Sequence, residues 1–197
     1  MPLSPPVARE HLHTRTVECL GFRRQDGLWD IEAHMVDTKT YGFPNHDRGR
    51  IEAGEPLHGM WLRLTIDDDF KIHDAEAVTD HGPFHLCAEI NPAYRKLIGH
   101  TIGRGFTKTC TSLFGGAHGC THLLELLRPL ATTAYQTLYP VREKKRREEA
   151  SDKRPGIIDS CYALRSESPV VEREWPAFYT GEPTGQASKP TEWTEDA

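Results

Sequence analysis

The chain has 197 residues, of which 37% are hydrophobic, and a formal net charge of −5. This length suits one medium-sized domain with polar appendages. The mild charge, without a concentrated basic patch, disfavours a nucleic-acid partner. The longest apolar run, 123–138, is interrupted by Glu125, Arg128 and Pro129 and therefore predicts a soluble helix, with no membrane partner.

The five cysteines are an odd number and lack the spacing of a disulfide scaffold. Residues 1–13 are proline-rich and polar, with neither the basic nor the apolar region of a secretory signal. We therefore expect a flexible N-terminus over 1–13 and a reduced, cytoplasmic protein.

Two successive hairpins are predicted in the first half of the chain. The first pairs 17–22 with 28–35 around the turn signal at 25–27, and the second pairs 60–66 with 71–79. Apolar and polar residues alternate in 28–35 and in 60–66, as is typical of half-buried strands. A polar loop is expected over 42–54, between the hairpins.

The second half of the chain has helical periodicity. Helices are predicted over 86–98, over 103–114 and from Thr121 onward, and Pro129 should bend the last one or mark its boundary. Strands followed by helices predict an α+β fold, an antiparallel sheet of two successive hairpins with three helices packed on one face. The apolar stripe of the last helix comprises Leu123, Leu127, Leu130, Ala134 and Leu138.

These elements predict a core domain over 14–140. A charged linker is expected over 141–156, followed by a returning arm or extra strand over 157–180. The composition of 181–197 predicts a disordered tail.

Cys120 follows a glycine-rich loop, 115–119, and lies where the last helix begins. Thiolate and imidazole are ligands that zinc and iron accept. If residue 120 is already helical, His122 points away from Cys120; if the helix begins after His122, then His118, Cys120 and His122 share one side. A small buried thiol beside two solvated histidines is the alternative interpretation.

Three further residues are candidate ligands. His58 is in phase with the apolar residues of its strand, so its imidazole should reach the buried face and needs a partner there. His85 and Cys87 lie at the crossing from sheet to helix. We therefore predict a single zinc or iron ion bound by Cys120 and His58 with His85 or Cys87, and with His118 as a further candidate.

Glu32, Asp37 and His122 are candidates for proton transfer in catalysis. Glu32 and Asp37 are expected on the polar face of their strand together with Asp30 and His34. The solvated side of an ordinary strand is the alternative explanation for this row of polar residues.

Four segments resemble the NifU-like iron-sulfur scaffold family in their order and in a few residues. These segments are 57–66, 72–77, 97–102 and 118–123. That resemblance implies a cluster ligand at each of three places. His58 occupies the first place, 83–87 lies near the second, and His118 and Cys120 lie near the third with Gly119 inserted between them. Cys120 is the ligand that carries over, and His58 stands where the family has a thiolate.

Residues 15–176 resemble more closely a bacterial family, domain-of-unknown-function family 2889. The similarity lies in 26–32, 37–39, 54–58 and 119–123, and it implies no established activity. Together these observations predict a metal-assisted lyase or hydrolase acting on a small-molecule substrate. An iron-sulfur cluster scaffold or carrier without turnover, or a non-catalytic ligand-binding domain, are the alternatives.

Overall fold

The computed structural model describes residues 3–148 and 153–182. The chain divides into two compact units, Met1–Lys145 and Arg146–Ala197. Most of the predicted disordered tail, from residue 183 onward, lies outside the described residues. Within the part of the chain that is described, no helix combines the length and apolar character that crossing a membrane requires.

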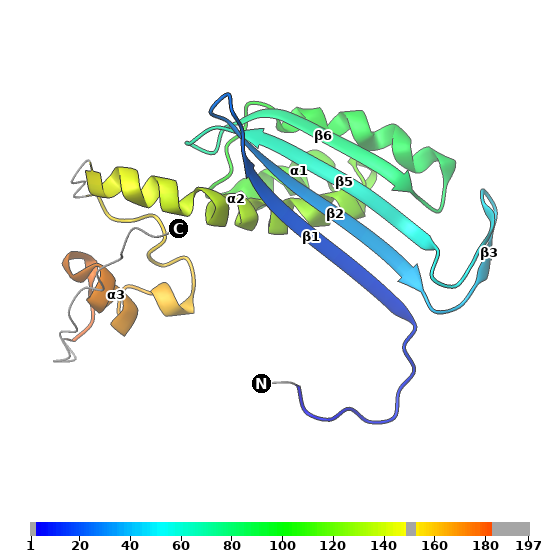
Figure 1. The fold of residues 1–197 in the computed structure, drawn as a ribbon, viewed down its shortest axis with the longest axis horizontal. Coiled ribbons are helices and arrows are strands. Elements are labelled where there is room, and N and C mark those ends of the chain that lie inside the picture. Colours follow the sequence, from blue (N-terminus) through cyan, green and yellow to red (C-terminus); the bar gives the residue numbers. More distant parts are fainter. Residues whose placement is uncertain (1–2, 149–152, 183–197) are drawn as a thin grey trace. The chain divides into compact units, whose positions relative to one another are not determined.

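The first unit is built on a four-stranded antiparallel sheet (Figure 1). Its strands lie in the order β1-β2-β5-β6, so each predicted hairpin forms and the two hairpins pair through β2 and β5. The prediction of an α+β fold with an antiparallel sheet is confirmed. The strand bounds are β1 His13–Arg23, β2 Trp29–Lys39, β5 Pro56–Ile66 and β6 Ile72–His81.

The segment between the hairpins is more ordered than a loop. Strands β3 (Phe43–Asn45) and β4 (Gly49–Ile51) form a separate two-stranded sheet. The side-chain oxygen of Asn45 accepts hydrogen bonds from the backbone N–H groups of Asp47 and Arg48, which closes the turn between the strands. The prediction of a plain polar loop over 42–54 is therefore wrong.

Helices cover one face of the sheet and lie behind it in Figure 1. Residues 86–98, predicted as helical, form a run of 3-10 turns. The last helix continues through Pro129, which therefore does not mark its boundary, and also through Pro140. The predicted apolar stripe of that helix is buried, and this packing on both sides of Pro129 offsets the hydrogen bond lost at the proline. The bounds are η1 His85–Leu97, α1 Phe106–Phe114, η2 Gly116–His118 and α2 Thr121–Glu148.

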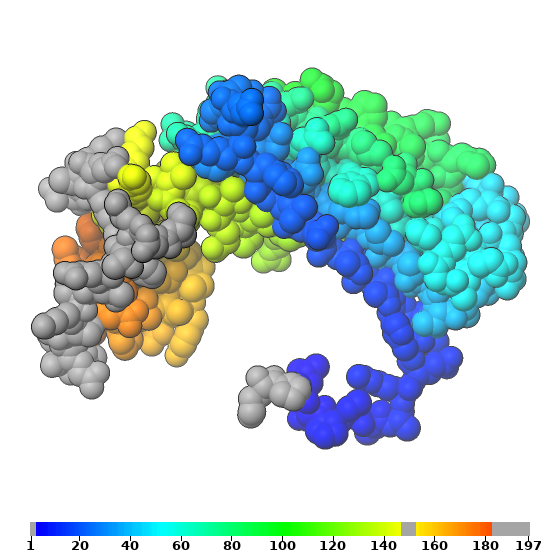
Figure 2. Space-filling model, in the orientation of Figure 1, coloured from blue at the N-terminus to red at the C-terminus, as the bar shows by residue number. Residues whose placement is uncertain are grey.

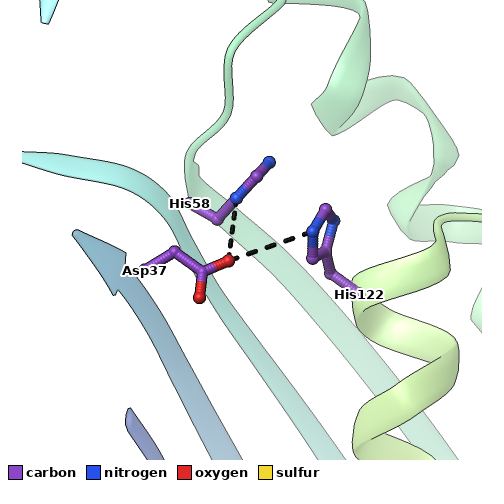
Figure 3. Close-up of side chains that lie close together, drawn as sticks. All are labelled: Asp37, His58 and His122. Carbon is purple, nitrogen blue, oxygen red and sulfur yellow. Dashed lines mark hydrogen bonds and ion pairs between the residues drawn. The ribbon is translucent and has the colours of Figure 1, made fainter. Parts of the chain in front are cut away.

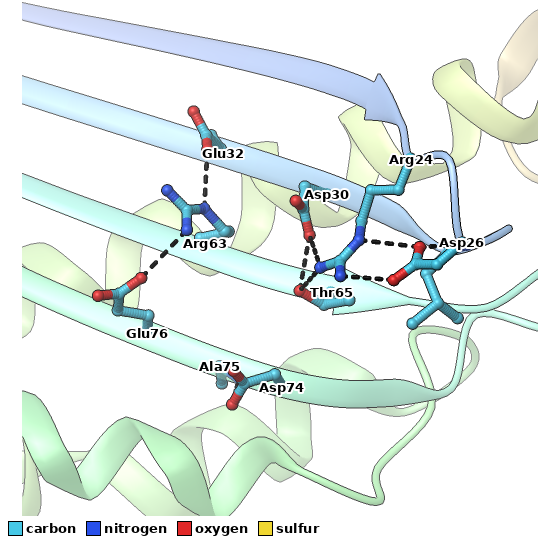
Figure 4. A network of polar contacts seen from close by, with 10 residues as sticks. Arg24, Asp26, Asp30, Glu32, Arg63, Thr65, Asp74, Ala75 and Glu76 are labelled. Atoms are coloured by element: carbon cyan, nitrogen blue, oxygen red, sulfur yellow. Dashed lines mark hydrogen bonds and ion pairs between the residues drawn. The ribbon is translucent and has the colours of Figure 1, made fainter.

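The two faces of the sheet differ in chemistry. On the inner face Ile31, Ala33 and Met35 of β2 are at most 1% exposed and pack with the leucines of α2. On the outer face Glu32 accepts a hydrogen bond from Arg63, within a network of paired charges (Figure 4). Strand β1 forms an edge and is exposed over most of its length (Figure 2).

The second unit contains short helices where the sequence allowed an extra strand. These are η3 (Tyr162–Leu164), α3 (Pro169–Glu174) and η4 (Pro176–Phe178). Ser168 caps α3 by accepting a hydrogen bond from the Val171 N–H group at 3.2 Å. A proline at the first helical position favours helix initiation over strand pairing, so the described part of 157–180 is helical rather than extended.

Candidate metal centre

A row of polar side chains crosses the inner face at one end of the sheet. Arg15 of β1 is paired with Asp37 of β2, and Asp37 is paired with His58 of β5. Directly opposed residues in antiparallel strands project to the same face, so all three meet on the side that the helices cover. His122, in the first turn of α2, approaches them from the helical layer (Figure 3).

The position of Asp37 corrects the sequence analysis. Asp37 is an odd-numbered residue of β2, like the buried Ile31, Ala33 and Met35, so its side chain projects to the same inner face. It is 1% exposed there. The prediction that Asp37 shares the wet face with Glu32 is wrong, because a two-residue period separates odd from even positions.

The Asp37 carboxylate is fully engaged with basic groups. Arg15 donates from Nε to Oδ1 and from Nη2 to Oδ2, both at 2.8 Å. His58 Nδ1 lies 2.9 Å from Oδ2, and His13 Nε2 lies 3.3 Å from Oδ1. A buried carboxylate with these partners remains charged and is held in one orientation.

The electrostatics of the site follow from burial and the Arg15 charge. Burial by itself would raise the pKa of Asp37, but the hydrogen bonds and charge of Arg15, together with His58, outweigh it and lower the pKa to about 2. Burial, and then the nearby His122, lower the pKa of His58. Burial, and then Arg15, lower the pKa of His122. Both imidazoles are thus favoured in the neutral form that binds a metal ion.

The two imidazoles lie close to each other and to the carboxylate. The ring centroids of His58 and His122 are 3.8 Å apart, and His122 Nε2 is 3.9 Å from Asp37 Oδ2. One ligand atom from each of Asp37, His58 and His122 lies within 4.8 Å of the others. Two imidazoles and one carboxylate form a donor set that both zinc and iron accept, with coordination positions left open.

Cys120 lies beside this group without belonging to it. The helix begins at Thr121, one residue after Cys120, and Cys120 Sγ is 3.9 Å from His122 Nδ1 and 3.9 Å from Met60 Sδ. The buried Tyr94 hydroxyl donates to the Cys120 carbonyl at 2.9 Å and accepts from the Cys120 N–H group at 3.2 Å. This clamp fixes the start of α2, and thereby the direction in which His122 leaves the helix.

The other predicted site residues lie elsewhere. His118 and His85 are exposed, and the backbone N–H group of His85 donates to Asp47. Cys87 packs next to Gly82, and Glu32 pairs with Arg63 on the outer face. Among the described residues, the group that could hold a metal ion consists of Asp37, His58 and His122. His58 was predicted as a ligand, whereas Asp37 and His122 were predicted as proton-transfer residues.

Arg15 and His13 were not among the site residues predicted from the sequence. The hairpin turn at 24–28 sets the register of β1 on β2, and counting outward from it pairs Arg15 with Asp37. Irregular pairing between Asp37 and Thr38, and between Gly59 and Met60, interrupts the ladder next to the row. Such bulges re-aim side chains and are frequent beside functional sites.

Two surface hollows of about 220 Å³ each occur in the first unit. One lies between α1 and α2, with Glu125 in its lining, and the other lies beside His81 and His85. Neither is lined by Asp37, His58 or His122. The side chains of His58 and His122 are 12% and 25% exposed, so each imidazole keeps some contact with solvent.

Comparison with known proteins gives a family and no activity. The family model described as "Protein of unknown function (DUF2889)" matches residues 13–136, which contain every residue of the site. No curated protein and no solved structure matches the chain. The resemblance to the NifU-like fold therefore stays a prediction.

Proposed function

Because the chain belongs to the family of proteins of unknown function DUF2889, we propose its function from the site itself: the protein binds one zinc or iron ion through Asp37, His58 and His122. The observation that carries this proposal is the convergence of two imidazoles on a buried carboxylate.

The alternative explanation is a purely structural ion pair between Arg15 and Asp37. Such a pair accounts for the charge on Asp37 but not for the two adjacent imidazoles beside it. Either histidine could be apolar without leaving the carboxylate unpaired. The second imidazole therefore favours metal binding over a structural role.

We further propose that the ion acts on a small molecule in the cytoplasm. Three protein ligands leave open positions where a metal ion can polarise a substrate oxygen or lower the pKa of a bound water. Lyase or hydrolase chemistry uses both effects. With Asp37 and His122 holding the ion, proton transfer would fall to groups beside it, such as His13.

The iron-sulfur alternative has less support. Cluster binding needs several thiolates, and the group of potential ligands found in the described residues contains no cysteine. A brown protein whose absorption depends on Cys120 would restore that alternative.

Elemental analysis tests the proposal. We expect about one zinc or iron ion per chain in the purified protein, and less than a tenth of that in His58→Ala and in His122→Ala. His34→Ala is the matched control, because His34 lies on the outer face against Trp61. Folded, metal-free wild-type protein after incubation with either ion would overturn the proposal, and the site would then be structural.

A further inference from the structure

We propose that the metal-loaded site binds small carboxylate anions between the ion and the Arg15 guanidinium. This inference rests on the proposed metal site and names the class of substrate for it. It is carried by the contacts of Arg15, which joins the buried Asp37 to Glu125 of α2.

A metal ion and Arg15 compete for the same carboxylate. Asp37 Oδ2 already accepts hydrogen bonds from Arg15 Nη2 and from His58 Nδ1. An oxygen with two lone pairs has no further place for a cation, so an ion at Oδ2 must displace at least one donor. In the proposed site His58 binds the ion through Nε2 and keeps its Nδ1–H group on Asp37, which makes Arg15 the group that is released.

Charge gives a second reason for this release. A divalent ion beside a guanidinium is a close pair of like charges, and the Arg15 side chain is 35% exposed, so it can turn outward. Its other carboxylate partner, Glu125, is more exposed at 53% and holds Arg15 near the site. We therefore expect the guanidinium to stay close to the ion while its Nε and Nη2 donors no longer bind Asp37.

Loading the ion also reverses the local charge. Without metal, Asp37, Glu125 and Arg15 together carry a net charge of about −1, from two carboxylates and one guanidinium. A divalent ion changes this to an excess of one positive charge, because imidazoles bind a metal ion in their neutral form. The loaded site is then complementary to a monoanion.

The geometry selects a carboxylate. A guanidinium presents parallel N–H donors whose spacing matches two carboxylate oxygens, as it does towards Asp37 in this structure. An incoming carboxylate can accept the two parallel donors of Arg15 with its two oxygens and bind the ion with one of these oxygens as well. His13, whose side chain is 40% exposed, lies on the same edge strand and offers a further donor.

Cobalt(II) provides a spectroscopic test that needs no known substrate. The wild-type protein is loaded with cobalt and titrated with acetate, and with acetamide as the neutral isostere, while the visible cobalt bands are recorded. We expect saturable changes with acetate and none with acetamide.

Substitution of Arg15 gives the decisive comparison. In Arg15→Gln we expect cobalt to bind at least as tightly as in the wild type and acetate to bind at least tenfold more weakly. Arg63→Gln is the matched control, because Arg63 pairs with Glu32 and Glu76 on the outer face. Glu125→Gln, at an exposed position, should strengthen acetate binding by removing one negative charge beside the site, and it serves if Arg15→Gln does not fold.

The outcomes separate this inference from the proposed function. Failure of the wild type to bind cobalt removes both. Cobalt binding with an acetate response that is unchanged in Arg15→Gln and in Glu125→Gln overturns the anion site alone. Markedly weaker cobalt binding in Arg15→Gln contradicts the competition between Arg15 and the metal ion.

Discussion

Asp37 is the residue around which the site is organised. It lies on the core face of a strand, where an ionised group is costly unless it is paired, and its partners come from β1, β5 and α2. A carboxylate placed in this way holds its neighbours at fixed distances in the absence of metal. The three side chains of the proposed metal site are therefore already close together without an ion, and Arg15 is the group that must move.

The depressed pKa of Asp37 makes stability depend on pH. The folded-state pKa is about 2 and the unfolded value is 3.8, so the contribution of this carboxylate is fully present above pH 4 and is lost as the pH falls towards 2. We expect the difference in free energy of unfolding between wild type and Asp37→Asn to shrink by about 1 kcal/mol between pH 6 and pH 3. Urea unfolding with a chelator present measures it.

The same measurement can refute the assignment. A difference between the two proteins that is constant from pH 6 to pH 3 would mean that the Asp37 pKa is not depressed by folding. Asp80→Asn, on the outer face beside Trp61, controls for the general effect of removing a carboxylate.

Single residues of the site were partly predictable. The phase of His58 with Met60 and Leu62 correctly indicates the inner face, and the same parity applied to Asp37 would have placed it there. Placing Arg15 in the site requires the register of the β1–β2 hairpin, because no local sequence pattern marks this residue. The proximity of His122 to His58 depends on how α2 packs on the sheet, which no local sequence pattern specifies.

At the level of elements, the glycine-rich loop before α2 allows two helices to meet. A Cβ atom on Gly119 would lie 2.5 Å from the Phe114 carbonyl oxygen at the end of α1. The backbone of Gly119 is extended, so glycine is needed here for space and not for conformation. The close approach sets where α2 begins, together with the Tyr94 clamp on Cys120.

Substitution of Gly119 should therefore impair both folding and the site. We expect Gly119→Ala to destabilise the protein by about 1–3 kcal/mol, since the backbone at Phe114 must move, and to weaken metal binding by displacing His122. Chemical denaturation and metal titration measure the two effects.

Gly103→Ala is the control for this substitution. Its added Cβ would meet Tyr135 Oη at an ordinary 3.8 Å, and we expect a change within about 0.5 kcal/mol. Equal stability of the two variants would show that the contact at Gly119 does not position α2.

The elements themselves were largely predictable from periodicity. Two-residue alternation located the strands, and the leucine stripe located α2, because both patterns reflect burial of one side. The small β3–β4 sheet escaped prediction, and the sequence left open whether Pro129 bends α2 or ends it. Both depend on local hydrogen bonds or packing that outweigh residue preference.

At the level of the whole first unit, the site joins parts of the chain that are distant in sequence. Asp37, His58 and His122 come from two strands and from the helix packed over them. An ion bound by all three ligands is present in the folded state and lost on unfolding, so it stabilises the fold by linkage.

Metal should therefore raise the thermal stability of the protein. At free metal about 100 times the Kd, linkage contributes roughly 2.7 kcal/mol. This corresponds to an increase in Tm of roughly 5–10 °C for a chain of this size. Calorimetry should show the increase in wild type and in His34→Ala and its loss in His122→Ala; an equal increase in all three proteins would place the ion elsewhere.

X-ray absorption at the zinc edge tests the ligand set most directly. For zinc-loaded wild type we expect a first shell of nitrogen and oxygen at about 2.0–2.1 Å, with outer-shell scattering from two imidazoles. We expect no change in Cys120→Ser and no zinc spectrum from His122→Ala, which should not retain the ion. A sulfur shell at about 2.3 Å, or a spectrum unaltered by the loss of His122, would contradict an ion held by Asp37, His58 and His122.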